Sequence, residues 1–236
     1  MLIFNKSQGV ASDAAVRRAV QAAVNCEDVL FSSYGNPDLY KVYSSYMFES
    51  SALWYTDAGG ECYNQGDPEA ARALFDAAGW SDTDVFRILV RTDSSNSYAQ
   101  AQVIQEELRA IGVNCELVAC DAASYSDTRN NHPESWDAFI TSFGPKVLPN
   151  MNLFLSASWA GWCADERIQG DLAAIASDTD LDSARATWEA LQRYMYEDFV
   201  PVVKFGTTQL SGVCRSSVTG ALIKERLVWI DARPVA

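Results

Sequence analysis

The segment from Val85 to Cys120 restricts the fold more than any other part of the chain. Val85 to Arg91 has the apolar run of a buried strand, and Tyr98 to Ile111 has the apolar spacing of a helix that ends at Gly112. Val113 to Cys120 then alternates as a second strand. Such a unit forms a right-handed crossover between two parallel strands. The predicted fold class is therefore α/β, a sheet with flanking helices.

A second feature is a short apolar strand that opens into a Gly- and Pro-rich segment. Ala138 to Thr141 is predicted as a buried strand, and the residues after Phe143 include Lys146, Asn150 and Asn152. In open α/β sheets, ligands bind at the carboxyl ends of the strands. This segment is therefore a candidate binding site, although many strands of an α/β core end in ordinary turns and the segment alone leaves that alternative open.

The remaining elements are predicted from periodicity and capping signals. Residues 2 to 5 indicate a strand, and residues 12 to 30 indicate one amphipathic helix. Asp67 and Pro68 begin a helix that stops at Gly79. Further along the sequence we expect an irregular excursion over 32–60, helices over 123–128, 165–176 and 181–197, and strands over 199–205, 210–214 and 227–230.

Composition excludes several classes of function. The net charge is −13, whereas binding to a phosphate backbone requires clustered Lys and Arg, so nucleic acid is not an expected partner. The apolar runs are shorter than the roughly 18 to 20 residues that span a bilayer. The six cysteines form no C-x-x-C pair, and we expect them to be small buried residues, with one disulfide left open if the protein is exported.

The sequence carries no catalytic motif that its context supports. His132 is the single histidine and lies beside Pro133 in a polar loop, which argues against a metal centre or a His-based triad. Phosphate-binding glycine loops and G-x-S-x-G are also missing from the sequence. We therefore expect no enzyme and no cofactor; titratable groups converging in a pocket would favour an enzyme instead.

Four motifs in order resemble the family 5 extracellular solute-binding proteins, the oligopeptide, dipeptide and nickel receptors of ABC importers. SDAAVRRAVQAAVNCEDVL is similar to their D-x-x-V-R-x-A helix, and GDPEAARALFDAAGW resembles their D-P-x-x-A-x-x-L helix. IQEELRAIGVNCELVACDAASY and VPVVKFG resemble two later family segments. Together these motifs run through most of the chain. The resemblance implies a periplasmic-binding-protein-like lobe, with a mixed β-sheet and flanking helices.

The resemblance also implies a domain organisation and a location. Family members are longer and have two lobes, the second inserted into the first. Residues 1–206 resemble the inserted second lobe, and residues 207–236 resemble the return to the first lobe. A signal peptide would lie upstream, so the expected location of the full-length protein is extracytoplasmic. The implied partners are a small-molecule or oligopeptide ligand and the permease subunits of the importer, with a monomeric receptor held to the membrane only by an anchor absent from this chain.

The family's ligand segment, G-W-x-x-D-Y-x-[DN]-P, is altered in this sequence. Phe143 stands for the Trp, and Lys146 falls where an Asp would hold the amino terminus of a peptide. Because one ammonium repels another, Lys146 and Arg129 favour a ligand with a carboxylate or another anionic group. Surface lysine and surface ion pair are the alternatives for these two residues. The predicted ligand-binding residues are Arg129, Ser142, Phe143, Gly144, Lys146, Asn150, Trp162 and Phe205.

Two functions are thus compared. The first is the substrate-capturing component of an ABC importer, which closes about a hinge over its ligand. The second is a ligand-sensing module fused to a regulatory or signalling domain. An isolated lobe offers half of a cleft, so weak ligand binding is expected from this chain. Trp162 and its neighbour Trp159 either stack on a ligand or cover the core of the lobe.

Overall fold

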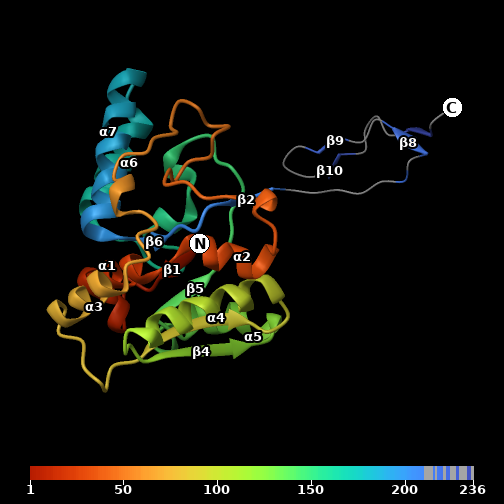
Figure 1. Ribbon diagram of the computed structural model, residues 1–236. Coiled ribbons are helices and arrows are strands. Elements are labelled where there is room, and N and C mark those ends of the chain that lie inside the picture. The colour runs from red at the N-terminus through yellow and green to blue at the C-terminus, as the bar shows by residue number, and fades with distance from the viewer. Residues whose placement is uncertain (210–214, 216, 220–221, 224–226, 229–232, 235–236) are drawn as a thin grey trace.

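The centre of the computed structural model is a five-stranded mixed sheet (Figure 1). The structure describes residues 1–209, 215, 217–219, 222–223, 227–228 and 233–234, so the strand predicted over 210–214 and Cys214 lie outside the described residues. The strand order is β4-β3-β5-β1-β6. The strands are β1 (Leu2–Phe4), β3 (Phe86–Arg91), β4 (Cys115–Cys120), β5 (Ala138–Ile140) and β6 (Val202–Val203).

The register of the sheet confirms the β-α-β unit. β3 and β4 are parallel and pair from Phe86–Cys115 to Arg91–Cys120, and β3 also pairs in parallel with β5. β1 is antiparallel to both β5 and β6. The carboxyl ends of β3, β4, β5 and β6 consequently meet at one edge of the sheet, and the functional site is to be sought there.

The two faces of the sheet bury two separate apolar clusters. Along β1, Leu2 and Phe4 belong to one cluster, whereas Ile3 belongs to the other. Along β5, Phe139 likewise faces away from Ala138. This alternation follows from the period of two in a strand. The first four helices cover one face, and the pair α6 and α7 covers the other (Figure 1).

The helix predicted over residues 12–30 is wrong as a single element. The structure has α1 (Ala14–Ala23) and α2 (Cys26–Tyr34), separated by two extended residues. The side chain of Asn25 accepts hydrogen bonds from the N–H groups of Glu27 and Asp28, at 3.0 and 3.3 Å. An asparagine that caps a new helix in this way ends the old one.

The other helices follow the predicted order with shifted ends. The N-cap of α3 is Asp67, as predicted, and accepts from the N–H groups of Glu69 and Ala70. α4 begins before Tyr98, and α5 is longer than predicted because Asp121 caps it earlier. The bounds are α3 (Pro68–Ala77), α4 (Ser95–Ala110), α5 (Ala122–Asn131), α6 (Glu166–Ser177) and α7 (Leu181–Tyr194).

The strand predicted over 199–205 is much shorter in the structure. A π-helical turn (Met195–Phe199) follows α7, and Val200 has a left-handed φ of 45°. Only Val202–Val203 then pairs as β6. Arg17 explains why the strand begins late. Its guanidinium donates to the carbonyl oxygens of Phe199 and Val200, so these carbonyls do not pair with a neighbouring strand.

The excursion between α2 and α3 is irregular, as predicted, and packs over the sheet. It contributes Tyr46 and Trp54 to the second cluster. Its strand β2 (Tyr40–Lys41) pairs antiparallel with β7 (Thr207–Thr208). The remaining short elements are 3₁₀ helices at Val10–Ser12, Pro37–Leu39, Gly60–Cys62, Pro133–Ser135, Pro149–Met151 and Leu153–Leu155, and strands β8 (Val218–Thr219), β9 (Leu222–Ile223), β10 (Leu227–Val228) and β11 (Arg233–Pro234).

Glu107 of α4 gives a pH-dependent prediction. Its Oε1 accepts from the N–H of Asn25 at 3.2 Å, its Oε2 is buried without a hydrogen bond, and burial raises its pKa to about 8. Unfolded, this carboxyl loses its proton near pH 4.5. The folded protein therefore holds an extra proton between these values, and stability falls as the pH rises from about 4.5 to 8.

We expect Glu107→Gln to remove this slope. The neutral amide keeps an acceptor for Asn25 and carries no charge to desolvate, so the variant should be on the order of 2 kcal/mol more stable above pH 8. At pH 4.5 the two proteins should unfold alike. Urea unfolding across this pH range measures the difference, with the exposed Glu106→Gln as control. Parallel pH profiles of wild type and Glu107→Gln would contradict the assignment.

Candidate functional site

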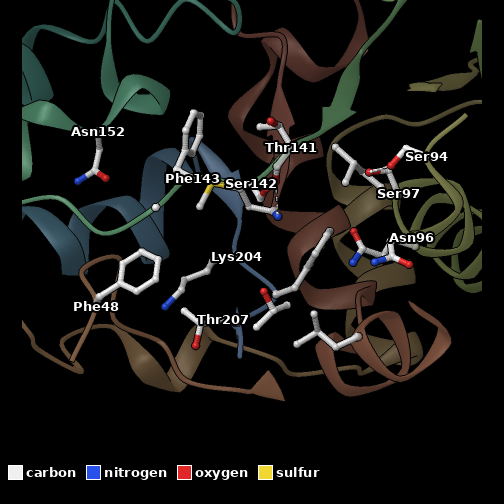
Figure 2. Close-up of a pocket in the computed structure, with 18 of the residues that line it drawn as sticks. Phe48, Ser94, Asn96, Ser97, Thr141, Ser142, Phe143, Asn152, Lys204 and Thr207 are labelled. Atoms are coloured by element: carbon white, nitrogen blue, oxygen red, sulfur yellow. Dashed lines mark hydrogen bonds between the residues drawn. The ribbon is translucent and has the colours of Figure 1, made fainter. Parts of the chain in front are cut away.

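A cavity of about 990 Å³ opens at the carboxyl edge of the sheet (Figure 2). β3 ends there at Arg91, β5 ends at Ile140, and residues 204–208 follow β6 along its floor. Residues from α2, α4, α5 and the excursion complete the walls. The position of the cavity agrees with the rule that ligands of open α/β sheets bind beyond the carboxyl ends of the strands.

The structure brings five of the eight predicted site residues together around the cavity. Residues lining it are Arg129, Ser142, Phe143, Gly144 and Phe205. Lys146, Asn150 and Trp162 do not belong to its lining. Asn152 lies on the cavity instead of Asn150; its buried amide donates to the carbonyl oxygen of Pro149 at 3.0 Å.

The segment around Lys146 connects Pro145 to Asn152, which both line the cavity, and so borders the cavity rim. The carbonyl oxygen of Lys146 accepts from the Ser51 hydroxyl at 2.7 Å, which fixes the backbone there. Beyond it, Val147 and Met151 leave 74% and 50% of their surfaces exposed. These apolar side chains form an open rim that has no cover within the described part of the chain.

The two tryptophans after this segment differ in their surroundings. Trp162 stacks on the buried Trp136, with ring centroids 5.8 Å apart, and belongs to the cover of the second cluster. Trp159 packs edge-on against Phe143 at 5.5 Å and so supports a wall of the cavity from behind. A ligand contact by Trp162 stays a prediction.

The guanidinium of Arg129 packs near three aromatic rings. Its guanidinium carbon is 5.3 Å from the ring centroid of Trp159, 5.6 Å from that of Phe139 and 5.8 Å from that of Tyr125. Its Nε donates to the side chain of Asn130 at 3.1 Å. Arg129 has no ion pair with a carboxylate among the described residues, so most of its donors are available to the cavity.

Lys204 is the site residue that sequence reasoning missed. It is 3% exposed, lines the cavity, and lies beside Phe48 and Thr207 in Figure 2. Its Nζ donates to the carbonyl oxygens of Tyr43 and Ser45 and stands 3.3 Å from the Tyr43 ring centroid. The signal in the sequence was a lysine inside the apolar run VPVVKF, where a strand would bury it.

Charged side chains on the cavity lining are cationic among the described residues. Its lining includes the cationic side chains of Arg91, Arg129 and Lys204 and, in the part of the chain the structure describes, no Asp or Glu. Arg91 is paired with Asp93 at 2.6 Å. Lys204 has hydrogen bonds to carbonyl oxygens and a contact with the Tyr43 ring, and its burial lowers its pKa well below 10.5, although the charge of Glu49 opposes this shift. A nearby anion would stabilise the charged form of Lys204.

Three further features of the described residues concern metal binding, thiols and membrane spans. They contain no cluster of three His, Cys, Asp or Glu side chains suited to a metal ion. Cys26, Cys62, Cys115, Cys120 and Cys163 are free thiols, and three of them are buried. Over the same residues, each helix falls short of the length or the apolar character needed to cross a bilayer.

Comparison with known proteins places the chain in a family. Residues 1–162 match the family model of the bacterial extracellular solute-binding proteins, family 5. A probable peptide ABC transporter periplasmic-binding protein from Sinorhizobium fredii, y4tO, is 27% identical over 94% of this chain. The alignment covers 43% of that relative, so the chain spans less than half of its length.

Solved structures show the same fold. NikA from Brucella suis, in complex with Fe(III)-EDTA, aligns with a TM-score of 0.74 at 17% identity, over 99% of this chain and 50% of its own. The substrate-binding protein CtaP from Listeria monocytogenes aligns with a TM-score of 0.74 at 17% identity, over 87% and 43% of the two chains. The sheet with its flanking helices therefore confirms the predicted fold class, and the chain belongs to the family 5 bacterial extracellular solute-binding proteins.

Proposed function

We propose that this chain is the second lobe of the substrate-capturing component of an ABC importer and that its ligand carries an anionic group held by Lys204. The observation that supports this most is a buried lysine on a cavity whose lining, within the described residues, contains no carboxylate. Burying an ammonium there is costly unless an anion joins it. The 27% identity with y4tO supports a peptide or a similar small molecule as ligand.

The domain organisation belongs to the same proposal. Residues 1–206 form the inserted lobe, and 207–236 lead back to a first lobe that closes over the cavity about a hinge. The exposed apolar rim formed by Val147 and Met151 supports this, because exposed apolar surface next to a ligand cavity is typical of a surface that becomes covered. The protein acts outside the cytoplasm, as a monomer, passing its ligand to permease subunits without chemistry.

A ligand panel tests the proposal. Free peptides, N-acetylated peptides, small organic acids, sugars and nickel are added in turn to the chain, and amide shifts are followed by NMR, which detects millimolar binding. We expect the acids and acetylated peptides to shift the signals of residues around Lys204. Shifts caused only by neutral sugars or by nickel would reject an anion site.

A further inference from the structure

The cavity has a second polar end, and it lies at the amino terminus of α4. Figure 2 shows Ser94, Asn96 and Ser97 grouped on one side of the pocket, with Lys204 on the other. No side chain caps this helix, and its first turn contains no acidic residue. The hydroxyl of Ser94 donates to that of Ser97 at 3.0 Å instead of to the backbone.

The first turn of α4 has backbone N–H groups without a hydrogen-bond acceptor among the described residues. The N–H groups of Ser95, Asn96 and Ser97 have no acceptor among the described residues, although the N–H of Tyr98 bonds to Ser94. Unpaired N–H groups at the start of a helix, together with its dipole, favour a negative charge. A helix start alone is a common feature, and a second observation is needed to make it a site.

Gln100 supplies that observation. It lies one turn further along α4, on the same face as Asn96 and Ser97, and lines the same cavity. Gln100 is 7% exposed, and its side chain makes no hydrogen bond with any described residue. Its amide atoms are not among the fully buried unpaired side-chain atoms of the described residues, so they are open to the cavity, where a ligand group can bind them.

We infer that the start of α4 is a second carboxylate subsite, and that the ligand is an organic acid or acidic peptide with two separate carboxylates. One carboxylate meets Lys204, and the other accepts from the first-turn N–H groups, the Ser97 hydroxyl and the Gln100 amide. Arg91 lies at the same end but is already neutralised by Asp93. The inference rests on the proposed function, since it adds a subsite to that cavity.

The test compares diacids with their half-amides. The linear dicarboxylates from succinate to pimelate, and the monoamide of each, are titrated by NMR into the chain, into Gln100→Glu and into Lys204→Met. We expect the diacid of matching length to bind about tenfold more tightly than its monoamide. Gln100→Glu, which has the same shape and a negative charge, should lower diacid affinity about tenfold and so remove the preference for the diacid over its monoamide.

A control and two contrary outcomes separate this inference from the proposed function. Gln102→Glu adds the same charge to the exposed side of α4 and should leave both affinities unchanged. The second subsite would be overturned if the diacid and the monoamide bound equally, the NMR signals of Gln100 did not shift, and Gln100→Glu did not change diacid affinity. That result would leave the Lys204 site intact. No response to any acid would reject the Lys204 site and the subsite that rests on it.

Discussion

Replacing Arg17 by methionine is expected to destabilise the protein by about 3 kcal/mol or more. Arg17 is 2% exposed, and its donors meet four carbonyl oxygens, those of Ala11, Ser12, Phe199 and Val200, at 2.7 to 3.0 Å. Methionine fills similar space but donates nothing, and buried carbonyls without donors cost about 1–3 kcal/mol each.

The effect should extend to the site. Arg17 anchors the turn that delivers β6 and Lys204 to the cavity floor, so a loosened turn also misplaces the ammonium. Urea unfolding measures the loss of stability, and Arg18→Met is the matched control, because Arg18 makes a single exposed hydrogen bond to the carbonyl of Asp198. An Arg17→Met protein as stable as Arg18→Met would contradict this role.

Replacing Lys204 by methionine is expected to abolish anion binding while the fold survives. The variant keeps the length of the side chain and removes a buried charge, but it leaves the carbonyl oxygens of Tyr43 and Ser45 without this donor, so a loss of stability of about 1–3 kcal/mol is expected. Removing one partner of a buried charge pair costs about 2 kcal/mol or more, so affinity for an acidic ligand should fall at least about thirtyfold.

The combination of readouts makes this prediction specific. NMR titration gives the affinity, and thermal unfolding shows that the fold is kept. Lys41→Met is the control, since Lys41 is an exposed lysine paired with Glu49 at 3.0 Å on the nearby strand β2. Unchanged acid binding by Lys204→Met would remove Lys204 from the site.

Much of the sheet could be predicted because its signals are local. The alternation in β4 and the cap at Asp67 each depend on residues close in sequence. The break at Asn25 was less predictable, because the apolar period continues through it while the asparagine side chain favours a new cap. The short β6 was missed because Arg17, distant in sequence, holds Phe199 and Val200 away from a ladder.

Some site residues could likewise be predicted from the sequence, whereas others depend on contacts distant in sequence. Phe143 and Gly144 were placed by the end of β5, a local feature, and Arg129 by the resemblance to the family. The side chain of Lys146 could not be placed, since the path of its loop depends on the distant Ser51. Lys204 was overlooked because a strand of apolar residues suggests core, and only the fold shows that a cavity reaches it.

The central claim is that this lobe recognises an anion through Lys204. The most direct measurement is the pair of dissociation constants, by NMR titration of this chain, for one N-acetylated peptide acid and for its C-terminal amide. We predict that the acid binds at least about tenfold more tightly than the amide, because only the carboxylate can form an ion pair with the buried ammonium. Equal affinities, or tighter binding of the amide, would contradict it.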